Sequence, residues 1–267
     1  NISNQEFLQI YNTMSFKKVE RDVFKIEKKC IQKCTKYIKL KKSNLFVSLY
    51  YTNFFHIVNI INKVSIYICG IVINSNIIEQ FSDEKAEILK KLALEKKIII
   101  INNVNLFFSN KSIVCNSLKK LFTFSDLVTI AINQNEQVDI FGQFSLDLLK
   151  LMTDEKRGVI LNMKGTGYNN HFINQKILDL VSKYKKYISG ILIDKRQYYM
   201  RDDNMLYMTD EIEMIENTVQ NAILNNGCDL VIYNAVEFKN LTKEYLESIS
   251  SSVKLFRDSS WPSFCNV

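Results

Sequence analysis

Eight short apolar runs recur along the chain after residue 44, and they constrain the fold more than any other feature. They are rich in β-branched and aromatic residues, which is typical of strands buried on both faces of a sheet. The runs lie at 45–50, 64–73, 98–101, 127–132, 158–163, 188–193, 205–208 and 230–233. We therefore predict eight buried strands.

Amphipathic stretches about as long as helices separate these runs. The clearest lie at 83–95, 109–121, 144–151, 175–187 and 210–224. Strands that alternate with helices predict βα units and a parallel sheet. Eight such units in 267 residues favour an α/β fold of the (β/α)8 TIM barrel type. Neither the Gly-rich dinucleotide fingerprint nor the P-loop motif is present in the sequence.

The first 43 residues differ from the rest in charge. Residues 1–45 carry eleven Lys and Arg against four Asp and Glu, which accounts for the net charge of +7 of the whole chain. Apolar residues at helical spacing predict two helices here, so we divide the chain into a basic helical segment at 1–43, a barrel at 44–258 and a carboxyl-terminal tail at 259–267. One alternative function is weak nucleic-acid binding through this segment, with Tyr37 available for stacking. The phosphate contacts would be Lys25, Lys28, Lys29, Lys33, Lys36 and Lys39.

The six cysteines are scattered, so free thiols are expected rather than a disulfide framework. Cys30 and Cys34 stand four residues apart, but the histidines, His56 and His171, are distant in sequence, and we expect no metal site. No apolar stretch approaches the roughly 20 residues of a membrane span. The expectation is a cytoplasmic protein without a membrane partner.

Several segments, in order along the chain, resemble the orotidine 5'-monophosphate decarboxylase family, in particular the decarboxylase domain of uridine monophosphate synthase. The segment KKSNL at 41–45 resembles the family's K-K-x-T-N-L-C, and SDLV at 125–128 resembles W-A-D-L-V. RG at 157–158, SGIL at 189–192 and GCDLVI at 227–232 are similar to further strand motifs. The resemblance implies a barrel that pairs with a second copy, and a basic segment that corresponds to a linker helix.

The same resemblance implies that the catalytic residues are replaced. The family uses a D-x-K-x-x-D run after the third strand, and an uncharged Asn or Phe can neither crowd a substrate carboxylate nor donate a proton near neutral pH. The ribose, lysine and phosphate positions on other strands also change, and Thr166 is the counterpart of a serine that contacts the pyrimidine. The replaced positions correspond to Tyr50, Val72, Asn103, Asn105, Phe108, Asp210 and Ala235.

We therefore expect a non-catalytic pseudoenzyme that acts as a protein-binding or structural scaffold. Its expected state is a homodimer with an unidentified protein partner, without a cofactor or a small-molecule substrate. Tyr198, Tyr199 and Met200 are the candidate contact surface, because exposed aromatic residues mark interfaces. A remaining alternative is a nucleotide sensor or an enzyme with changed chemistry at the barrel mouth. Its polar groups would include Tyr50, Asn103, Asn105, Lys164, Asp194, Lys195, Arg196 and Asp210.

Overall fold

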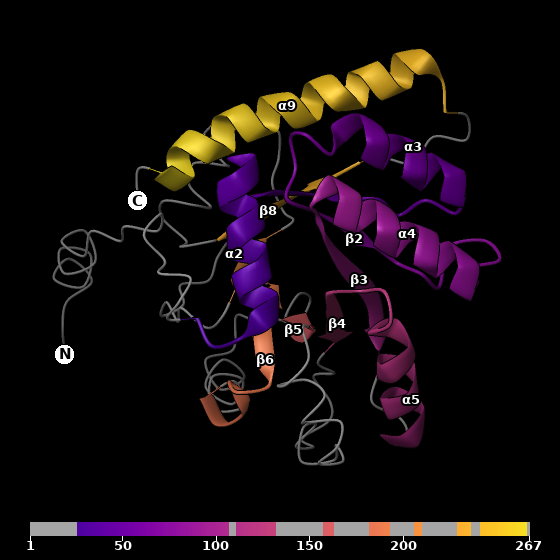
Figure 1. The fold of residues 1–267 in the computed structure, drawn as a ribbon, viewed down its shortest axis with the longest axis vertical. Helices are drawn as coiled ribbons and strands as arrows, with labels where there is room; N and C mark the ends of the chain where they lie inside the picture. Colours follow the sequence, from indigo (N-terminus) through magenta and orange to yellow (C-terminus); the bar gives the residue numbers. More distant parts are fainter. Residues whose placement is uncertain are drawn as a thin grey trace, which may run out of the picture.

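The protein is a closed barrel of eight parallel strands in sequence order (Figure 1). The computed structural model describes residues 26–106, 111–131, 157–162, 182–192, 206–209, 229–235 and 241–265. The barrel closes because β1 pairs in parallel with both β2 and β8. The strands are β1 (Leu45–Ser48), β2 (Gly70–Ile73), β3 (Ile99–Leu106), β4 (Leu127–Ala131), β5 (Gly158–Asn162), β6 (Ile188–Leu192), β7 (Leu206–Thr209) and β8 (Leu230–Asn234). The predicted (β/α)8 fold is confirmed.

Helices cover the outside of the barrel in the described part of the chain (Figure 1). They are α2 (Lys29–Lys41), α3 (Phe54–Val64), α4 (Asp83–Lys96), α5 (Lys111–Leu121) and α9 (Lys243–Cys265). The predicted helices at 83–95 and 109–121 correspond to α4 and α5. Those at 144–151 and 210–224, and most of 175–187, lie outside the described residues. The α9 helix continues without a break past residue 258 and includes most of the segment that we assigned to the tail.

The basic segment does not stand apart from the barrel, because α2 packs against the amino-terminal ends of the strands. Its apolar face is buried through Ile31, Cys34 and Ile38, at the i, i+3, i+7 spacing of one helix face. Burying each large aliphatic side chain contributes about 1.5–3 kcal/mol. The Lys41 ammonium donates to the carbonyl oxygen of Ser65 at 2.7 Å and ties the end of α2 to the end of α3.

The prediction of a strand at 64–73 was wrong at its amino-terminal end. Val64 is the last residue of α3, a turn follows, and the strand begins only at Gly70. The α3 sequence is rich in Ile, Val and Phe, so its composition resembles that of a strand. An N-terminal cap favours the helix, because the Asn53 side chain accepts hydrogen bonds from the backbone N–H groups of Phe55 (2.9 Å) and His56 (3.4 Å).

Two helices end on a lysine in the left-handed backbone conformation. Lys42 follows α2 with φ of 49°, and Lys97 follows α4 with φ of 54°. A residue with a Cβ atom pays about 1–2 kcal/mol to adopt this conformation, which is why glycine is common at this position.

We therefore expect Lys42→Gly and Lys97→Gly each to raise the free energy of unfolding by about 0.5–1 kcal/mol, as measured by urea denaturation. The matched control is Lys91→Gly on the exposed side of α4, within the helix, which should lower stability by about 1 kcal/mol. A loss of stability in the two cap variants would contradict the strain argument.

Candidate functional site

The carboxyl ends of the parallel strands form a small cavity at the mouth of the barrel, the place where barrels of this class carry their active sites. Three polar side chains, Tyr50, Asn103 and Thr129, lie on one side of it. The other lining residues are Val72, Ile101, Ile160, Leu192, Met208 and Ile232. None of these nine residues carries a charge. The space between them has room for at most about one water molecule.

The three polar side chains bond to one another. The amide nitrogen of Asn103 donates to the Tyr50 hydroxyl at 2.5 Å, and the Thr129 hydroxyl donates to the amide oxygen of Asn103 at 2.6 Å. Thr129 is buried, and the other two side chains are partly exposed. Both ends of the Asn103 amide therefore have partners within the protein, which is what a buried polar group requires for stability. This cluster binds β3 to β4 and to the residues after β1.

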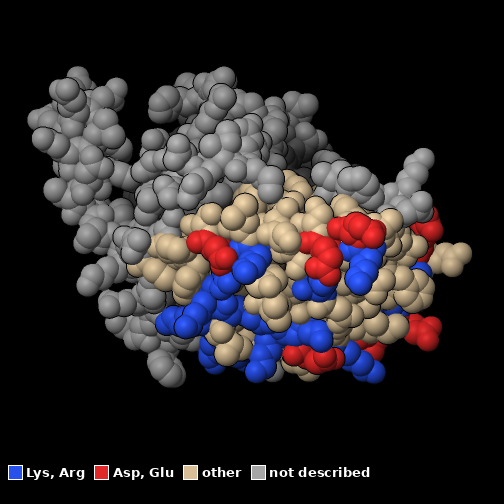
Figure 2. Space-filling model, turned by 90° about the horizontal axis from the view of Figure 1, so that it is seen from above, with Lys and Arg blue, Asp and Glu red and all other residues tan. Residues whose placement is uncertain are grey.

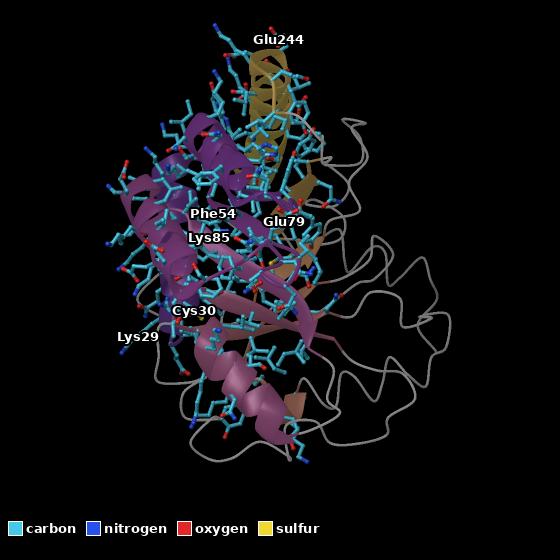
Figure 3. The ribbon with its side chains drawn as sticks, turned by 90° about the vertical axis from the view of Figure 1, so that its right-hand side faces the viewer. Lys29, Cys30, Phe54, Glu79, Lys85 and Glu244 are labelled. Atoms are coloured by element: carbon cyan, nitrogen blue, oxygen red, sulfur yellow. The ribbon has the colours of Figure 1, made fainter. Side chains whose placement is uncertain are left out.

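The rim of the mouth near β1 and β2 is held by contacts that do not involve the cavity. The backbone N–H of Glu79 donates to the carbonyl oxygen of Thr52 at 2.8 Å, and the Lys85 ammonium donates to the carbonyl oxygen of Glu79 at 2.7 Å. Phe54, Glu79 and Lys85 lie together in Figure 3, with Lys85 5.7 Å from the centre of the Phe54 ring. Lys85 thus stabilises the loop between β2 and α4 at the rim of the mouth.

The structure brings together three of the positions predicted for the former active site. Tyr50, Val72 and Asn103 line the same cavity, as the resemblance implies. Ala235 lies just beyond β8, where its backbone N–H donates to the carbonyl oxygen of Ser48 at 3.2 Å, and Asn105 lies in β3. Phe108, Thr166 and Asp210 lie outside the described residues, as do Lys164, Asp194, Lys195, Arg196, Tyr198, Tyr199 and Met200.

Sequence reasoning missed Thr129. It is a polar residue in the middle of the apolar run of β4, at a position that alternates with the neighbouring buried Val128 and Ile130. A lone polar residue that faces the interior of a barrel needs a partner, so its position in the run was a usable signal.

The lysines proposed to bind polyanions do not share one exposed face. The Lys28 ammonium contacts the carbonyl oxygens of Lys185 and Ile188, and Lys33 forms an ion pair with Asp126 at 2.6 Å. Lys29, Lys36 and Lys39 are exposed, and Lys25 lies outside the described residues. The prediction grouped Lys28 and Lys33 with the exposed lysines. Helical spacing alone does not distinguish a lysine that faces water from one that faces the end of a strand.

The ion pair of Lys33 belongs to a larger charged cluster at the amino-terminal end of the barrel. Asp126, 2% exposed, also accepts from Arg157 at 3.1 Å and from the backbone N–H of Ile100 at 3.0 Å. Arg157 donates in addition to the carbonyl oxygen of Phe122 at 2.8 Å. Four segments, α2, β3, β4 and β5, meet at this one carboxylate, far from the mouth.

The cysteines of α2 face the protein interior. The Cys30 thiol donates to the Ser189 hydroxyl at 3.3 Å, and burial raises the pKa of Cys30. Cys34 is buried as well, and burial raises the pKa of the neighbouring Cys69 well above its usual value. Within the described residues, no group of three or more His, Cys, Asp and Glu side chains is placed to hold a metal ion. In that same part of the chain, no helix is long and apolar enough to cross a bilayer.

Comparison with known proteins gives a likeness of structure only. No protein-family model and no curated protein matches the sequence. The structure is similar to that of KGPDC from Streptococcus mutans, with a TM-score of 0.54 and 13% identity over 82% of this chain and 97% of that one.

Two further similar structures bear the name of the family that the sequence resembles. Orotidine 5'-monophosphate decarboxylase from Methanocaldococcus jannaschii, complexed with the inhibitor BMP, gives a TM-score of 0.55 and 13% identity over 78% of this chain and 97% of that one. A putative orotidine-monophosphate-decarboxylase from Toxoplasma gondii gives a TM-score of 0.54 and 13% identity over 87% of this chain and 99% of that one. The chain therefore has an orotidine monophosphate decarboxylase-like barrel fold.

Proposed function

We propose that this chain is a pseudoenzyme, a decarboxylase-like barrel without catalytic activity that serves as a protein-binding or structural scaffold. The observation that carries the proposal is the lining of the mouth: six apolar side chains and a Tyr50–Asn103–Thr129 cluster whose members bond to one another. Decarboxylation and phosphate binding both depend on charges placed where the substrate lies. The nine described residues that line the cavity supply none.

The polar cluster supports a structural role for the mouth. A catalytic amide or hydroxyl is useful when it is presented to a substrate, whereas here the amide of Asn103 is already engaged at both ends. A substrate would have to break these bonds before it could use them, at a cost of about 0.5–1.5 kcal/mol for each. The cluster is therefore better suited to stabilising the barrel than to binding a ligand.

The direct test is calorimetric titration of the full chain with uridine 5'-monophosphate and with BMP, alongside a decarboxylation assay on orotidine 5'-monophosphate. The decarboxylase from M. jannaschii serves as the positive control in each measurement. We expect neither heat of binding nor turnover. Binding in the micromolar range without turnover would replace the scaffold proposal with a nucleotide sensor, and turnover would overturn it.

Substitution of Asn103 tests the structural role of the cluster. We expect Asn103→Ala to lower the free energy of unfolding by about 1–3 kcal/mol, because the hydroxyls of Tyr50 and Thr129 lose their partner. The control is Asn76→Ala on an exposed turn, where a change within about 0.5 kcal/mol is expected. Unchanged stability in Asn103→Ala would argue for a group held ready for a ligand, since removing a functional polar residue often costs no stability.

The homodimer is part of the proposal, on the strength of the resemblance. Sedimentation equilibrium should give about twice the chain mass of 31.2 kDa. A monomer at micromolar concentration would remove the dimer from the proposal and leave the question of catalysis untouched.

A further inference from the structure

Three large aliphatic side chains are exposed where helices end at the amino-terminal rim of the barrel. Leu40 in the last turn of α2 is 57% exposed, Ile66 in the turn after α3 is 63% exposed, and Leu94 in the last turn of α4 is 67% exposed. Single exposed apolar residues are common on protein surfaces, but a cluster that comes from several elements marks an interaction site. We call this region, residues 36–42, 63–67 and 94–97, the helix-end surface.

The three elements lie next to one another. Lys41 donates to the carbonyl oxygen of Ser65, the residue before Ile66, at 2.7 Å. The α3 helix in turn contacts α4. Partial burial lowers the pKa of Lys41, and the positive charges of Lys97 and Lys96 act in the same direction. In Figure 1 the ends of α2, α3 and α4 gather beneath α9.

The helix-end surface is strongly basic. Residues 36–42, 63–67 and 94–97 contain seven lysines and one acidic residue, Glu95, which pairs with Lys96 at 2.8 Å. Lys63 pairs with Glu247 of α9 at 2.5 Å. Figure 2 shows many lysine and arginine side chains on this side of the described surface, with acidic side chains among and beside them. Lysine near a helix carboxyl end is favoured by the helix dipole. The dipole does not explain the three exposed aliphatic residues between these lysines.

The mixture of lysine and protruding aliphatic side chains fits one kind of partner best. Nucleic acid would favour exposed aromatic rings for base stacking. The two nearby tyrosines are partly buried under cations, Tyr37 under Lys33 and Tyr67 under Arg257. An anionic bilayer attracts lysines to its surface and accepts short aliphatic side chains at the boundary of its headgroups.

From this charge and apolarity we infer that the helix-end surface binds peripherally to anionic lipid membranes. The sequence predicts no membrane partner because it contains no spanning segment, but peripheral binding needs none. The barrel would lie with its amino-terminal end toward the bilayer and its mouth away from it. This orientation is independent of whether the mouth is catalytic.

Vesicle co-sedimentation of the full chain tests the inference. We expect binding to phosphatidylcholine vesicles that contain about 30% phosphatidylserine, weakened by added salt, and little binding to pure phosphatidylcholine. Lys42→Gln and Lys97→Gln should each weaken binding about fivefold. The triple variant Leu40→Ser, Ile66→Ser, Leu94→Ser should weaken it more than about tenfold.

Two controls separate the surface from the rest of the chain. Ile88→Ser and Lys91→Gln alter exposed residues of α4 outside the helix-end surface and should bind as the unaltered chain does. Lys42→Gly and Lys97→Gly should weaken binding about as much as the Gln variants although the helix caps become more stable, a combination that a purely structural role does not predict. Equal binding to both vesicle types, unchanged binding in the surface variants, or salt-sensitive binding to a single-stranded RNA but not to vesicles would each overturn the inference.

Discussion

Replacing Asp126 with Asn is expected to lower the free energy of unfolding by about 3–5 kcal/mol. The carboxylate accepts from Lys33 at 2.6 Å, from Arg157 at 3.1 Å and from the backbone N–H of Ile100 at 3.0 Å, and it is 2% exposed. Asparagine has nearly the same shape but no charge, so two cations remain in a region with little access to water. The side chains of Lys33 and Arg157 are only 28% and 21% exposed, so water can solvate the two unpaired charges only in part. Urea denaturation measures the change.

The exposed ion pair between Lys90 and Glu87 provides the control. Its atoms lie 3.3 Å apart and both side chains are about half exposed, so Glu87→Gln should change stability by less than about 0.5 kcal/mol. Hydrogen exchange adds a local readout, since the loss of Asp126 should increase exchange in α2 more than in α4. A stability loss below about 1 kcal/mol in Asp126→Asn would mean that the cluster does not hold α2 to the barrel.

The barrel could be predicted from sequence because its strands are buried on both faces. A run such as Ile99–Ile100–Ile101 has no polar face, so it fits only an element with helices on one side and a filled interior on the other. The ends of the strands could be predicted less well. The sequence predicts that the third strand ends at residue 101, but β3 continues through Asn103 and Asn105. In a barrel, a polar residue near the carboxyl end of a strand can remain in the ladder while its side chain reaches the mouth.

The contents of the candidate site could be predicted only in part. Tyr50 and Asn103 were singled out by the resemblance, but their hydrogen bond joins residues 53 positions apart, and that of Asn103 with Thr129 spans 26 positions. Such pairs depend on the stagger of neighbouring strands, which no local pattern encodes. The role of Lys33 was missed for the same reason, because its partner Asp126 lies 93 positions away.

The two ends of the barrel differ in chemistry. At the amino-terminal end, Asp126 and Arg157 lie in segments that resemble family motifs, and they form a charged cluster that joins α2 to three strands. At the carboxyl-terminal end, the described lining residues are uncharged. In barrels of this type the first end contributes stability and the second carries chemistry. Among the described residues, the charged cluster lies at the first end and the lining of the cavity at the second end is uncharged, and this contrast supports the proposed function.

The interior of the barrel is filled by side chains of uneven size, and Gly70 is where this matters most. Gly70 in β2 lies opposite Phe46 in β1, and a Cβ atom built on it would lie 2.0 Å from Cε1 and 2.4 Å from Cζ of the Phe46 ring. The ring is fully buried and has no solvent to move into. We expect Gly70→Ala to lower the free energy of unfolding by about 3 kcal/mol or more, at or above the upper end for overpacked cores.

A smaller residue at position 46 should relieve the clash. Phe46→Leu alone is expected to cost about 1–3 kcal/mol through lost contacts. If steric overlap is the cause, the double variant Gly70→Ala, Phe46→Leu should be at least about 1 kcal/mol more stable than the sum of the two single effects predicts. Urea denaturation of the four proteins completes the cycle. Additive losses would mean that the ring of Phe46 moves aside at little cost, and that the interior of β1 and β2 is less tightly filled than the distances around Gly70 indicate.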